Sequence, residues 1–352
     1  MKPDYLIIGS GLSALTFGAL MANSGKTVQI LEAHEHPGGF GHTFTMAKKY
    51  TFNAQFHYVW NCGEGQTVNQ VLKKLGLDKE VTFERYDPDG FDHMRMPGYA
   101  LDIPSEPEEL IDDFPAELAI PMLRDYLAVN WVRVKGGVYS YIEKILERFK
   151  GEVLLNVEID RISRSSDAVR IVRSTGEIQE FDKVVFATPP DQVMALLADP
   201  TDAETKRFSA WKANHATTLV HRDISMYARH GITQPSEFDF FQKADSRWGY
   251  NGCLNQLCGI SSPQHNFLSF QLEELITPDR IIHRQEHHTP LYTTESFRYR
   301  DEVVATNGEN NTYHAGAYLG DGLHEGAIAS AFRVAQLIEQ TKLKTVLLQP
   351  SS

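Results

Sequence analysis

The sequence has few cysteines, no long apolar run and no surplus of positive charge, and each shortage excludes a class of protein. Its three cysteines are too few and too unpatterned for a disulfide framework or a zinc site, so we expect Cys62, Cys253 and Cys258 to pack in the core. No stretch of about 20 apolar residues is present, so we expect no transmembrane helix. Residues 1–4 run directly into an apolar segment without a signal peptide, which predicts a cytoplasmic protein.

The charge balance is acidic. The chain has 46 acidic and 34 basic residues, a net charge of −12. This argues against nucleic acid and against an anionic membrane surface as partners. The 352 residues are 42% hydrophobic and 23% charged, which is typical of a globular protein with one large domain or two closely joined ones.

The most informative stretch is at the beginning of the chain. The apolar run 5–8 predicts a buried parallel strand, and the glycine-containing turn 9–14 leads into a segment with helical spacing that ends near Gly25. A second apolar run, 27–31, stops at Glu32. Strand, glycine turn, helix, strand and acid in this order predict a dinucleotide site.

Each part of this pattern has a physical role. Gly9 allows a tight turn, Gly11 lets a pyrophosphate approach the backbone, and the helix N-terminus offers free N–H groups to phosphate. Glu32 follows about 20 residues after the turn, where its carboxylate can accept hydrogen bonds from ribose hydroxyls. Gly38 and Gly39 then leave backbone N–H groups open to a second phosphate or to a flavin edge.

With these residues the sequence resembles the superfamily of FAD-dependent amine oxidases and phytoene desaturases. The resemblance implies an α/β protein whose Rossmann-like FAD-binding domain, of the GR2 type, carries an inserted antiparallel-sheet substrate domain. It also implies FAD as cofactor. Only about thirty residues, 101–131, connect the first two FAD segments, where larger members have a helical cap. We therefore expect a small substrate chamber, or one open to a protein partner or a second copy of the chain.

Two further segments carry the resemblance. Residues 133–190 resemble the second FAD segment, in which the backbone near Val157 brackets the adenine and an Ala-Thr-Pro-Pro turn packs near the phosphates. We expect the strand at 152–156 to continue through 162. Residues 312–328 resemble the C-terminal motif, with a helix from about Gly326 to residue 340 and a loose tail after residue 342. Ala317 replaces the common acid there, and Asp321 is the nearest carboxylate.

The resemblance implies a set of FAD-binding residues: Gly9, Gly11, Leu12, Ser13, Ala14, Glu32, Ala33, Gly38, Gly39, Phe40, Gly41, His42, Val157, Ala187, Thr188, Pro189, Gly316, Gly320, Asp321, His324, Glu325, Gly326 and Ala327. It also divides the chain into FAD segments 1–85, 131–205 and 311–340, a cap insertion 86–130, a substrate domain 206–310 and a tail 341–352.

The substrate domain is expected to be an aromatic-rich antiparallel sheet. Its predicted strands are residues 217–222, 236–242, 249–256 and 266–272, followed by a strand over 281–292 that carries three histidines. Period-two alternation places His283 and His287 on one face and His288 on the other, which argues against a metal site. An aromatic face over a flavin would form a lipophilic pocket.

The candidates for catalysis are His57, His215, His288 and His324. Amine oxidases often have a lysine beside the flavin on the strand after the Ala-Thr-Pro turn, but residues 214–219 contain none. We therefore favour an FAD-dependent oxidoreductase that takes hydride from a C–C or C–N bond of a small, lipophilic substrate. A non-redox flavoenzyme, either a relative of UDP-galactopyranose mutase or a fatty-acid double-bond isomerase, is an alternative. So is a protein that binds FAD without catalysis.

Overall fold

The computed structural model describes residues 2–41, 43–46, 50–53, 59, 62–85, 132–228, 232–235, 237–243, 247–259 and 261–347. His42, His57 and the expected cap insertion 86–130 therefore lie outside the described residues. The domain boundaries stay predictions.

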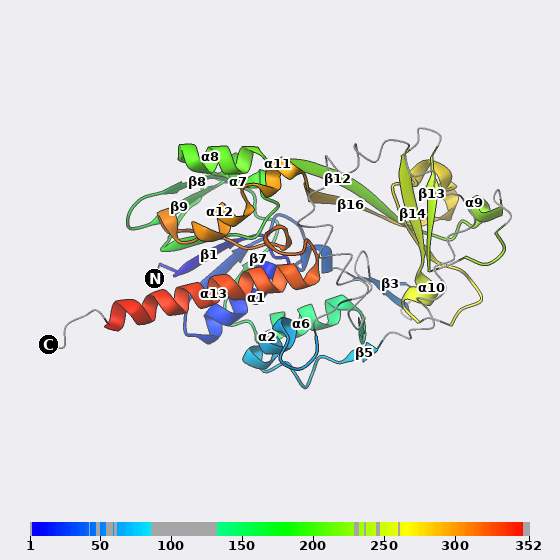
Figure 1. The fold of residues 1–352 in the computed structure, drawn as a ribbon, viewed down its shortest axis with the longest axis horizontal. Coiled ribbons are helices and arrows are strands. Elements are labelled where there is room, and N and C mark those ends of the chain that lie inside the picture. The colour runs from blue at the N-terminus through cyan, green and yellow to red at the C-terminus, as the bar shows by residue number, and fades with distance from the viewer. Residues whose placement is uncertain are drawn as a thin grey trace.

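A five-stranded parallel sheet forms the centre of the molecule (Figure 1). Its strands come from both ends of the chain and are ordered β17-β11-β1-β2-β7. They span Tyr5–Ile8 (β1), Val28–Leu31 (β2), Glu152–Leu154 (β7), Lys183–Phe186 (β11) and Thr312–His314 (β17). The three segments assigned to FAD binding from the sequence thus share one sheet.

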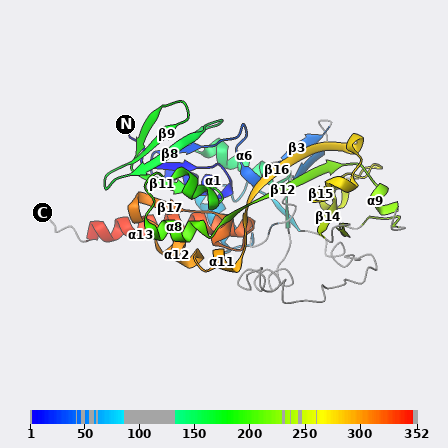
Figure 2. The same ribbon diagram turned by 90° about the horizontal axis from the view of Figure 1, so that it is seen from above.

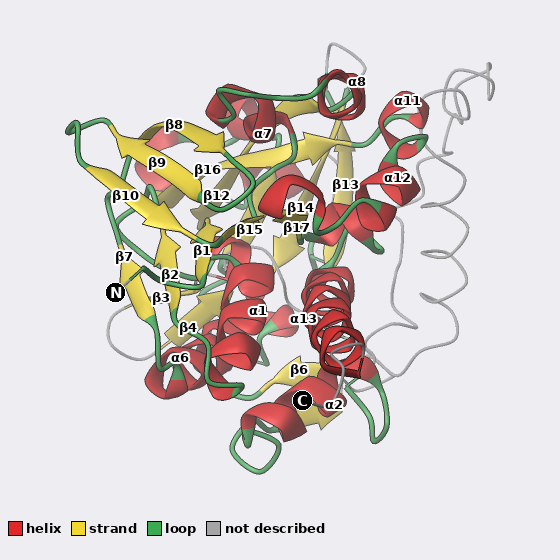
Figure 3. Cartoon of the chain, turned by 90° about the vertical axis from the view of Figure 1, so that its left-hand side faces the viewer, coloured by secondary structure: helices red, strands yellow, loops and turns green. Residues whose placement is uncertain are grey.

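Helices cover one face of this sheet, because alternate strand residues such as Ile7, Ile30 and Val185 are apolar and point toward them. The helices are α1 (Leu12–Asn23), α2 (Thr67–Leu75), α6 (Val138–Arg148) and α13 (His324–Leu347). Figure 3 shows α1 and α13 side by side. Helix α13 continues to Leu347, so the expectation of a loose tail after residue 342 was wrong for these residues.

The opposite face of the parallel sheet is also buried, with Leu6, Ile8 and Phe186 in a second core. It is covered by a three-stranded antiparallel sheet and short helices, which explains why the parallel strands are apolar throughout. These elements are β8 (Ile159–Arg164), β9 (Val169–Arg173), β10 (Ile178–Phe181), α7 (Asp191–Leu196), α8 (Asp202–Ser209), α11 (Thr294–Phe297) and α12 (Arg300–Ala305). The expected continuation of β7 through residue 162 was wrong: Asn156 has φ of 55° and ends the run, and β8 joins the other sheet.

A second five-stranded sheet, antiparallel, extends away from the first (Figure 2). Its strands are β12 (Lys212–His221), β13 (Phe238–Gln242), β14 (Trp248–Cys253), β15 (Phe267–Phe270) and β16 (Ile281–Leu291), in the order β13-β14-β15-β12-β16. The two longest strands, β12 and β16, pair with each other and extend from this sheet toward the parallel sheet (Figure 2). The predicted strand 249–256 ends early, at Cys253, where helix α10 (Leu254–Leu257) begins.

Smaller elements complete the fold. Two antiparallel two-stranded pairs join β3 (Thr43–Met46) to β4 (Tyr50–Asn53) and β5 (Phe83–Arg85) to β6 (Val132–Val134). The short helices are α9 (Ser225–Ala228), η1 (Gly39–Gly41), η2 (Glu273–Leu275), η3 (Pro278–Arg280), η4 (Glu309–Asn311) and η5 (Ala317–Leu319). Cys62 and Cys253 are buried as expected, whereas Cys258 is half-buried. Among the described residues, no helix has both the length and the apolar character to cross a membrane.

Candidate functional site

The glycine turn after β1 leaves the N-terminus of α1 uncovered. Gly9 has φ of 89°, and a Cβ there would lie 3.1 Å from the carbonyl oxygen of Ala187. The N-cap residue is Gly11, which has no side chain to satisfy the first-turn N–H groups, and that turn carries no acid. The helix end therefore presents free donors and a partial positive charge, which suits phosphate.

The second glycine turn packs directly on the first. The backbone N–H of Gly38 donates to the carbonyl oxygen of Ser10 at 3.0 Å, so the expectation that this N–H is open to a ligand was wrong. Gly39 has φ of 55°, and a Cβ on it would lie 3.0 Å from the Cα of Gly11. The two turns can approach this closely because neither glycine has a side chain, and together they form a backbone-lined cradle.

Glu32 is fixed at the end of β2 with 7% of its surface exposed. Its Oε2 accepts hydrogen bonds from the backbone N–H (2.8 Å) and the hydroxyl (2.6 Å) of Ser10, and its Oε1 accepts one from the N–H of His34 (3.0 Å). A carboxylate has about four acceptor positions, so capacity remains for a ribose hydroxyl. The N–H of Val157 donates to the carbonyl oxygen of Glu32 at 2.9 Å, which places this predicted adenine-side residue beside it.

The other predicted segments meet at the same edge of the sheet. The N–H of Ala187 donates to the carbonyl oxygen of Ile8, and Thr188 follows with a buried hydroxyl that has no hydrogen-bond partner among the described residues. The hydroxyl of Ser13 on α1 donates to the carbonyl oxygen of Ala327 on α13 at 3.0 Å. The structure thus brings the N-terminal, middle and C-terminal segments together, as the sequence predicted.

Asp321 has a specific structural role. Its Oδ1 accepts hydrogen bonds from the backbone N–H groups of Leu323 and Gly326, both at 2.8 Å. The carboxylate therefore caps the beginning of α13. Gly320 packs against Gly326, where a Cβ would lie 2.5 Å from the Gly326 Cα. Oδ1 of Asp321, the carboxylate nearest to Ala317 in the sequence, is thus engaged by the backbone of α13.

The first turn of α13 buries two further polar side chains. His324 is 3% exposed, and its Nε2 shares a hydrogen bond with the hydroxyl of Tyr141 on α6. Burial lowers the pKa of His324 to about 3, and burial raises the pKa of Glu325 to about 7. Within the described parts of the chain, the Nδ1 of His324 and the Oε2 of Glu325 are buried without hydrogen-bond partners.

These observations test whether the site suits FAD, which has phosphates, ribose hydroxyls and a polar ring edge. The cradle of bare backbone, the uncapped N-terminus of α1 and the spare capacity of Glu32 suit the first two groups. The partnerless polar atoms of Thr188, His324 and Glu325 are what a polar cofactor edge would satisfy. The residues present therefore fit FAD.

The predicted catalytic residues His215 and His288 lie together, apart from His324. They are directly opposite each other on β12 and β16, with ring centroids 4.7 Å apart. The Nε2 of His288 lies 2.7 Å from Asp191 Oδ2, and its Nδ1 lies 3.1 Å from Gln192 Nε2. Since Asp191 begins α7, these contacts anchor the β12–β16 pair to the elements that cover the parallel sheet. In the described part of the chain, no three His, Cys, Asp or Glu residues group as a metal site.

His287 lies on the opposite face of the same strand and was missing from the sequence-based candidates. It is 3% exposed, and its Nε2 lies 2.8 Å from the hydroxyl of Thr218. Its ring centroid lies 5.7 Å from that of Phe40, which belongs to the segment after Gly39. Burial lowers the pKa of His287 to about 4. The sequence feature that could have pointed to His287 was the strand alternation, which places it on the opposite face from His288.

Aromatic side chains extend from this point across the sheet. The register pairs Phe240 with Tyr250, Tyr250 with Phe270 and Phe270 with Thr218, so all four share one face. The rings of Tyr250 and Phe270 are stacked at 5.4 Å, and Phe240 is 49% exposed. We call Phe238, Phe240, Tyr250 and Phe270 the aromatic face. It leads across the sheet to Thr218 and His287.

The other face of the sheet contains a serine and a histidine in contact, but they cannot form a nucleophilic pair. His221 Nδ1 accepts a hydrogen bond from the backbone N–H of Asp223, so the ring proton is on Nε2. That Nε2 lies 2.7 Å from Ser269 Oγ and 2.9 Å from Asn251 Oδ1. A protonated Nε2 cannot accept the serine proton, and all three side chains are buried. This network therefore stabilises the sheet.

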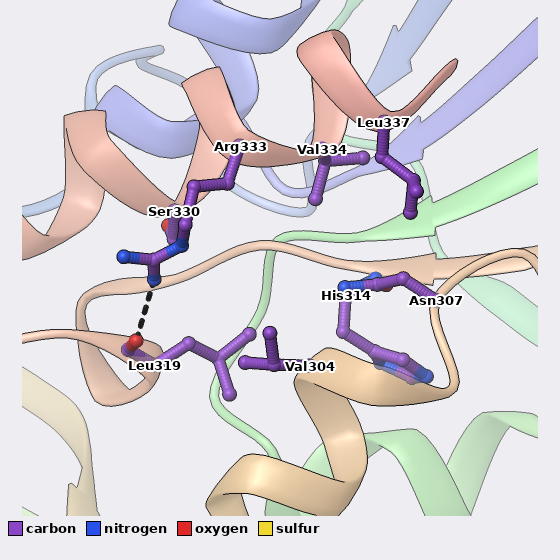
Figure 4. Close-up of a pocket in the computed structure, with 8 residues that line it drawn as sticks. All are labelled: Val304, Asn307, His314, Leu319, Ser330, Arg333, Val334 and Leu337. Carbon is purple, nitrogen blue, oxygen red and sulfur yellow. Dashed lines mark hydrogen bonds between the residues drawn. The ribbon is translucent and has the colours of Figure 1, made fainter. Parts of the chain in front are cut away.

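A small cavity of about 170 Å³ lies where α13 packs on β17 and α12 (Figure 4). Its lining is mostly apolar, and Arg333 donates a 2.7 Å hydrogen bond to the carbonyl oxygen of Leu319. Ligand pockets usually measure about 300–1,000 Å³. This cavity is too small for FAD, and we assign it to the packing of α13.

Two family models match the chain. The model described as NAD(P)-binding Rossmann-like domain matches residues 7–75. The model described as flavin containing amine oxidoreductase matches residues 123–221.

Curated relatives match a short part of the chain. All-trans-retinol 13,14-reductase of Homo sapiens is 35% identical over 74 residues, which are 21% of this chain and 12% of the reductase. The inactive all-trans-retinol 13,14-reductase of Danio rerio is 39% identical over 75 residues, which are 21% of this chain and 11% of that protein. The match thus spans about an eighth of these relatives' own length.

Solved structures match almost the whole chain in fold. A CLA-producing fatty acid isomerase from P. acnes superposes with a TM-score of 0.70 at 15% identity, covering 96% of this chain and 98% of that one. Putrescine oxidase bound to putrescine superposes with a TM-score of 0.66 at 14% identity, covering 97% and 99%. The chain thus has the fold of these flavoproteins, and the two family models, each over a part of the chain, support an FAD-dependent oxidoreductase of the amine oxidase type.

Proposed function

We propose that the protein takes a hydride equivalent from a C–C or C–N bond of a small apolar substrate. The observation that carries this proposal is the aromatic face, which leads across the antiparallel sheet to His287 beside Phe40. An apolar surface with a single convergent polar pair is the usual composition of a site for an apolar ligand.

Residues at the carboxyl edge of the parallel sheet would hold the cofactor. The turn at Gly11 and the N-terminus of α1 would bind phosphate, Glu32 would accept from ribose, and the backbone at Val157 would lie beside the adenine. The N-terminus of α13 would favour negative charge on the ring. When bound, the flavin supplies a two-electron acceptor. The individual FAD and catalytic residues remain proposals, and so do the domain boundaries.

The composition of β12 argues against amine oxidation by the arrangement that uses a lysine. Residues 214–219 contain none, and the ring beside Phe40 is that of His287, which is hydrogen-bonded to Thr218. Two of the similar proteins are named for activity on fatty acid and on retinol, which are both apolar molecules. A lipophilic substrate that loses hydride from carbon is therefore favoured.

A fatty-acid double-bond isomerase is the second candidate. Its support is the whole-chain likeness to the P. acnes isomerase, at a TM-score of 0.70 and 98% coverage of that chain. The same aromatic face would suit a fatty acid. The two candidates differ in electron balance, because an oxidoreductase leaves the flavin reduced and an isomerase does not.

Anaerobic flavin spectroscopy separates these functions. The purified protein is mixed with decylamine, oleic acid, linoleic acid or UDP-galactose, and the flavin absorption is followed while products are analysed. Bleaching by an apolar probe supports the proposal. Product without net bleaching supports the isomerase, turnover of UDP-galactose only after prior reduction supports a mutase, and neither bleaching nor turnover favours a protein that binds FAD without catalysis. A protein partner or second copy that closes the chamber stays a prediction.

A further inference from the structure

We propose that His287 is a catalytic residue, and that its imidazole accepts the proton that the substrate loses while a neighbouring bond gives up hydride. This inference rests on the proposed function and assigns the proton acceptor of that same site. His215 and His288 lie on the other face of the sheet, so this assignment does not involve their contacts.

The position of His287 supports this role. It lies where two surfaces meet: the aromatic face of the antiparallel sheet, through its partner Thr218, and the glycine-rich segment, through Phe40. The ring of His287 contacts Phe40, which belongs to the segment proposed to hold the cofactor. Any substrate lying along the aromatic face toward that segment would end against its ring.

The chemistry of the ring is suited to accepting a proton. The hydrogen bond between Thr218 Oγ1 and Nε2 fixes the ring orientation, while Nδ1 has no hydrogen bond with a described residue. When Nε2 carries the ring proton and donates it to the hydroxyl, Nδ1 is left with a free lone pair. Burial keeps the imidazole neutral, with a pKa lowered to about 4, so the lone pair is available at neutral pH.

The step balances for both bond types. In a desaturation, one C–H bond gives hydride to the flavin, and the adjacent carbon releases its proton to Nδ1 while that C–H pair becomes the new C=C bond. In oxidation of a C–N bond, the carbon gives hydride to the flavin, and the nitrogen releases its proton to Nδ1 as the C=N bond forms. Either step produces one reduced flavin and one imidazolium.

Among the residues that the structure describes, two titratable groups affect the pKa of His287. Glu286 on the same strand favours the imidazolium, while His283 on the same face opposes it. The elements packed against the ring contribute Thr218 and Phe40, neither of which is charged near neutral pH. The flavin is therefore the group whose change in charge should affect His287 most.

Nuclear magnetic resonance tests the placement without a substrate. The chain has 14 histidines, and the ring signal of His287 in the holoprotein labelled at histidine Cε1 is assigned with His287→Gln. A reduced flavin carries negative charge, so reduction by dithionite should shift the His287 signal and raise its measured pKa, whereas the His283 signal should stay in place. A His287 signal with the same position and pKa in oxidised and reduced protein overturns the proposal.

Kinetics then tests the role. In His287→Gln the flavin content should equal that of the parent, while anaerobic reduction by the bleaching probe (decylamine or oleic acid) should slow by roughly 100-fold and lose its acidic pH limb. His283→Gln, on the same strand and face, should stay within about threefold of the parent. A His287→Gln rate within about threefold, or a slower rate with the parent's pH profile, overturns the proposal. If neither probe bleaches the flavin, the proposed function fails, and the resonance experiment still decides where His287 lies.

Discussion

His314 should make the stability of the fold decrease as the pH falls below about 6.5. The ring lies between Phe186, stacked at 5.6 Å, and Phe208 at 4.7 Å, and it is 5% exposed. Its Nδ1 is buried and has no hydrogen-bond partner in the ranges that the structure describes. Burial lowers the pKa of His314 to about 3.

The direction and size follow from proton linkage. In the unfolded chain a histidine has a pKa of about 6.5. Below that pH the unfolded state binds a proton that the folded state, in which His314 stays neutral, does not bind. The stabilisation is fully present above about pH 6.5, is lost as pH falls, and the loss levels off near pH 3. Because pH 5 lies about 1.5 units below the pKa of histidine in the unfolded chain, the free energy of unfolding is about 2 kcal/mol lower there than at neutral pH.

The measurement compares the parent with His314→Leu, which removes the titration and keeps an apolar side chain between the phenylalanines. Urea unfolding of the FAD-loaded protein, followed by circular dichroism at pH 7 and pH 5, should show the parent losing about 2 kcal/mol more than the variant. The difference between proteins is used because Glu237 and Glu325, whose pKa values burial raises to about 7, shift the parent's stability in the opposite direction. The exposed His36 serves as control: His36→Leu should follow the parent. Parallel losses in the parent and His314→Leu would refute the reasoning.

Three further substitutions test the site and its support. Gly39→Val introduces a side chain at φ of 55° and places its Cβ 3.0 Å from Gly11 Cα, so flavin affinity, measured by titrating the protein with FAD, should fall roughly tenfold or more; unchanged affinity contradicts the cradle. Arg164→Met leaves the buried carboxylate of Glu204 without the guanidinium that donates to both its oxygens at 2.6 and 2.8 Å, and the variant should lose about 3–5 kcal/mol in urea unfolding; a loss below about 1 kcal/mol argues against the pair. Asp321→Ala removes the cap of α13 and should cost about 1 kcal/mol, while Asp321→Asn should cost less; equal costs would mean that capping is not its role.

The parts of the site that follow each other along the chain were predictable. Strand, turn, helix, strand and acid from residue 5 to Glu32 form one local unit, and each residue's role follows from its neighbours. The C-terminal helix was also predictable, although the sequence placed its start at Gly326, two residues after the observed start at His324. The cap by Asp321 explains this, because it organises the turn before the helix.

The contacts across the sheet could not be predicted from one sequence. Thr218 and His287 are 69 residues apart, and Asp191 and His288 are 97 apart, so no local pattern links either pair. Which histidine lies beside Phe40 depends on which face of the β12–β16 pair packs toward the segment after Gly39. The break at Asn156 was missed because an apolar run on both sides looks like one strand until a left-handed residue divides it.

The proposed function is tested most directly by anaerobic titration of the flavin in the purified 352-residue chain with decylamine and with putrescine, which share a primary amine but differ in apolar length, alongside oleic acid. We predict a protein that retains FAD and is bleached by decylamine or oleic acid, with little or no bleaching by putrescine. A protein without FAD, or one bleached by putrescine and by neither apolar probe, would contradict it.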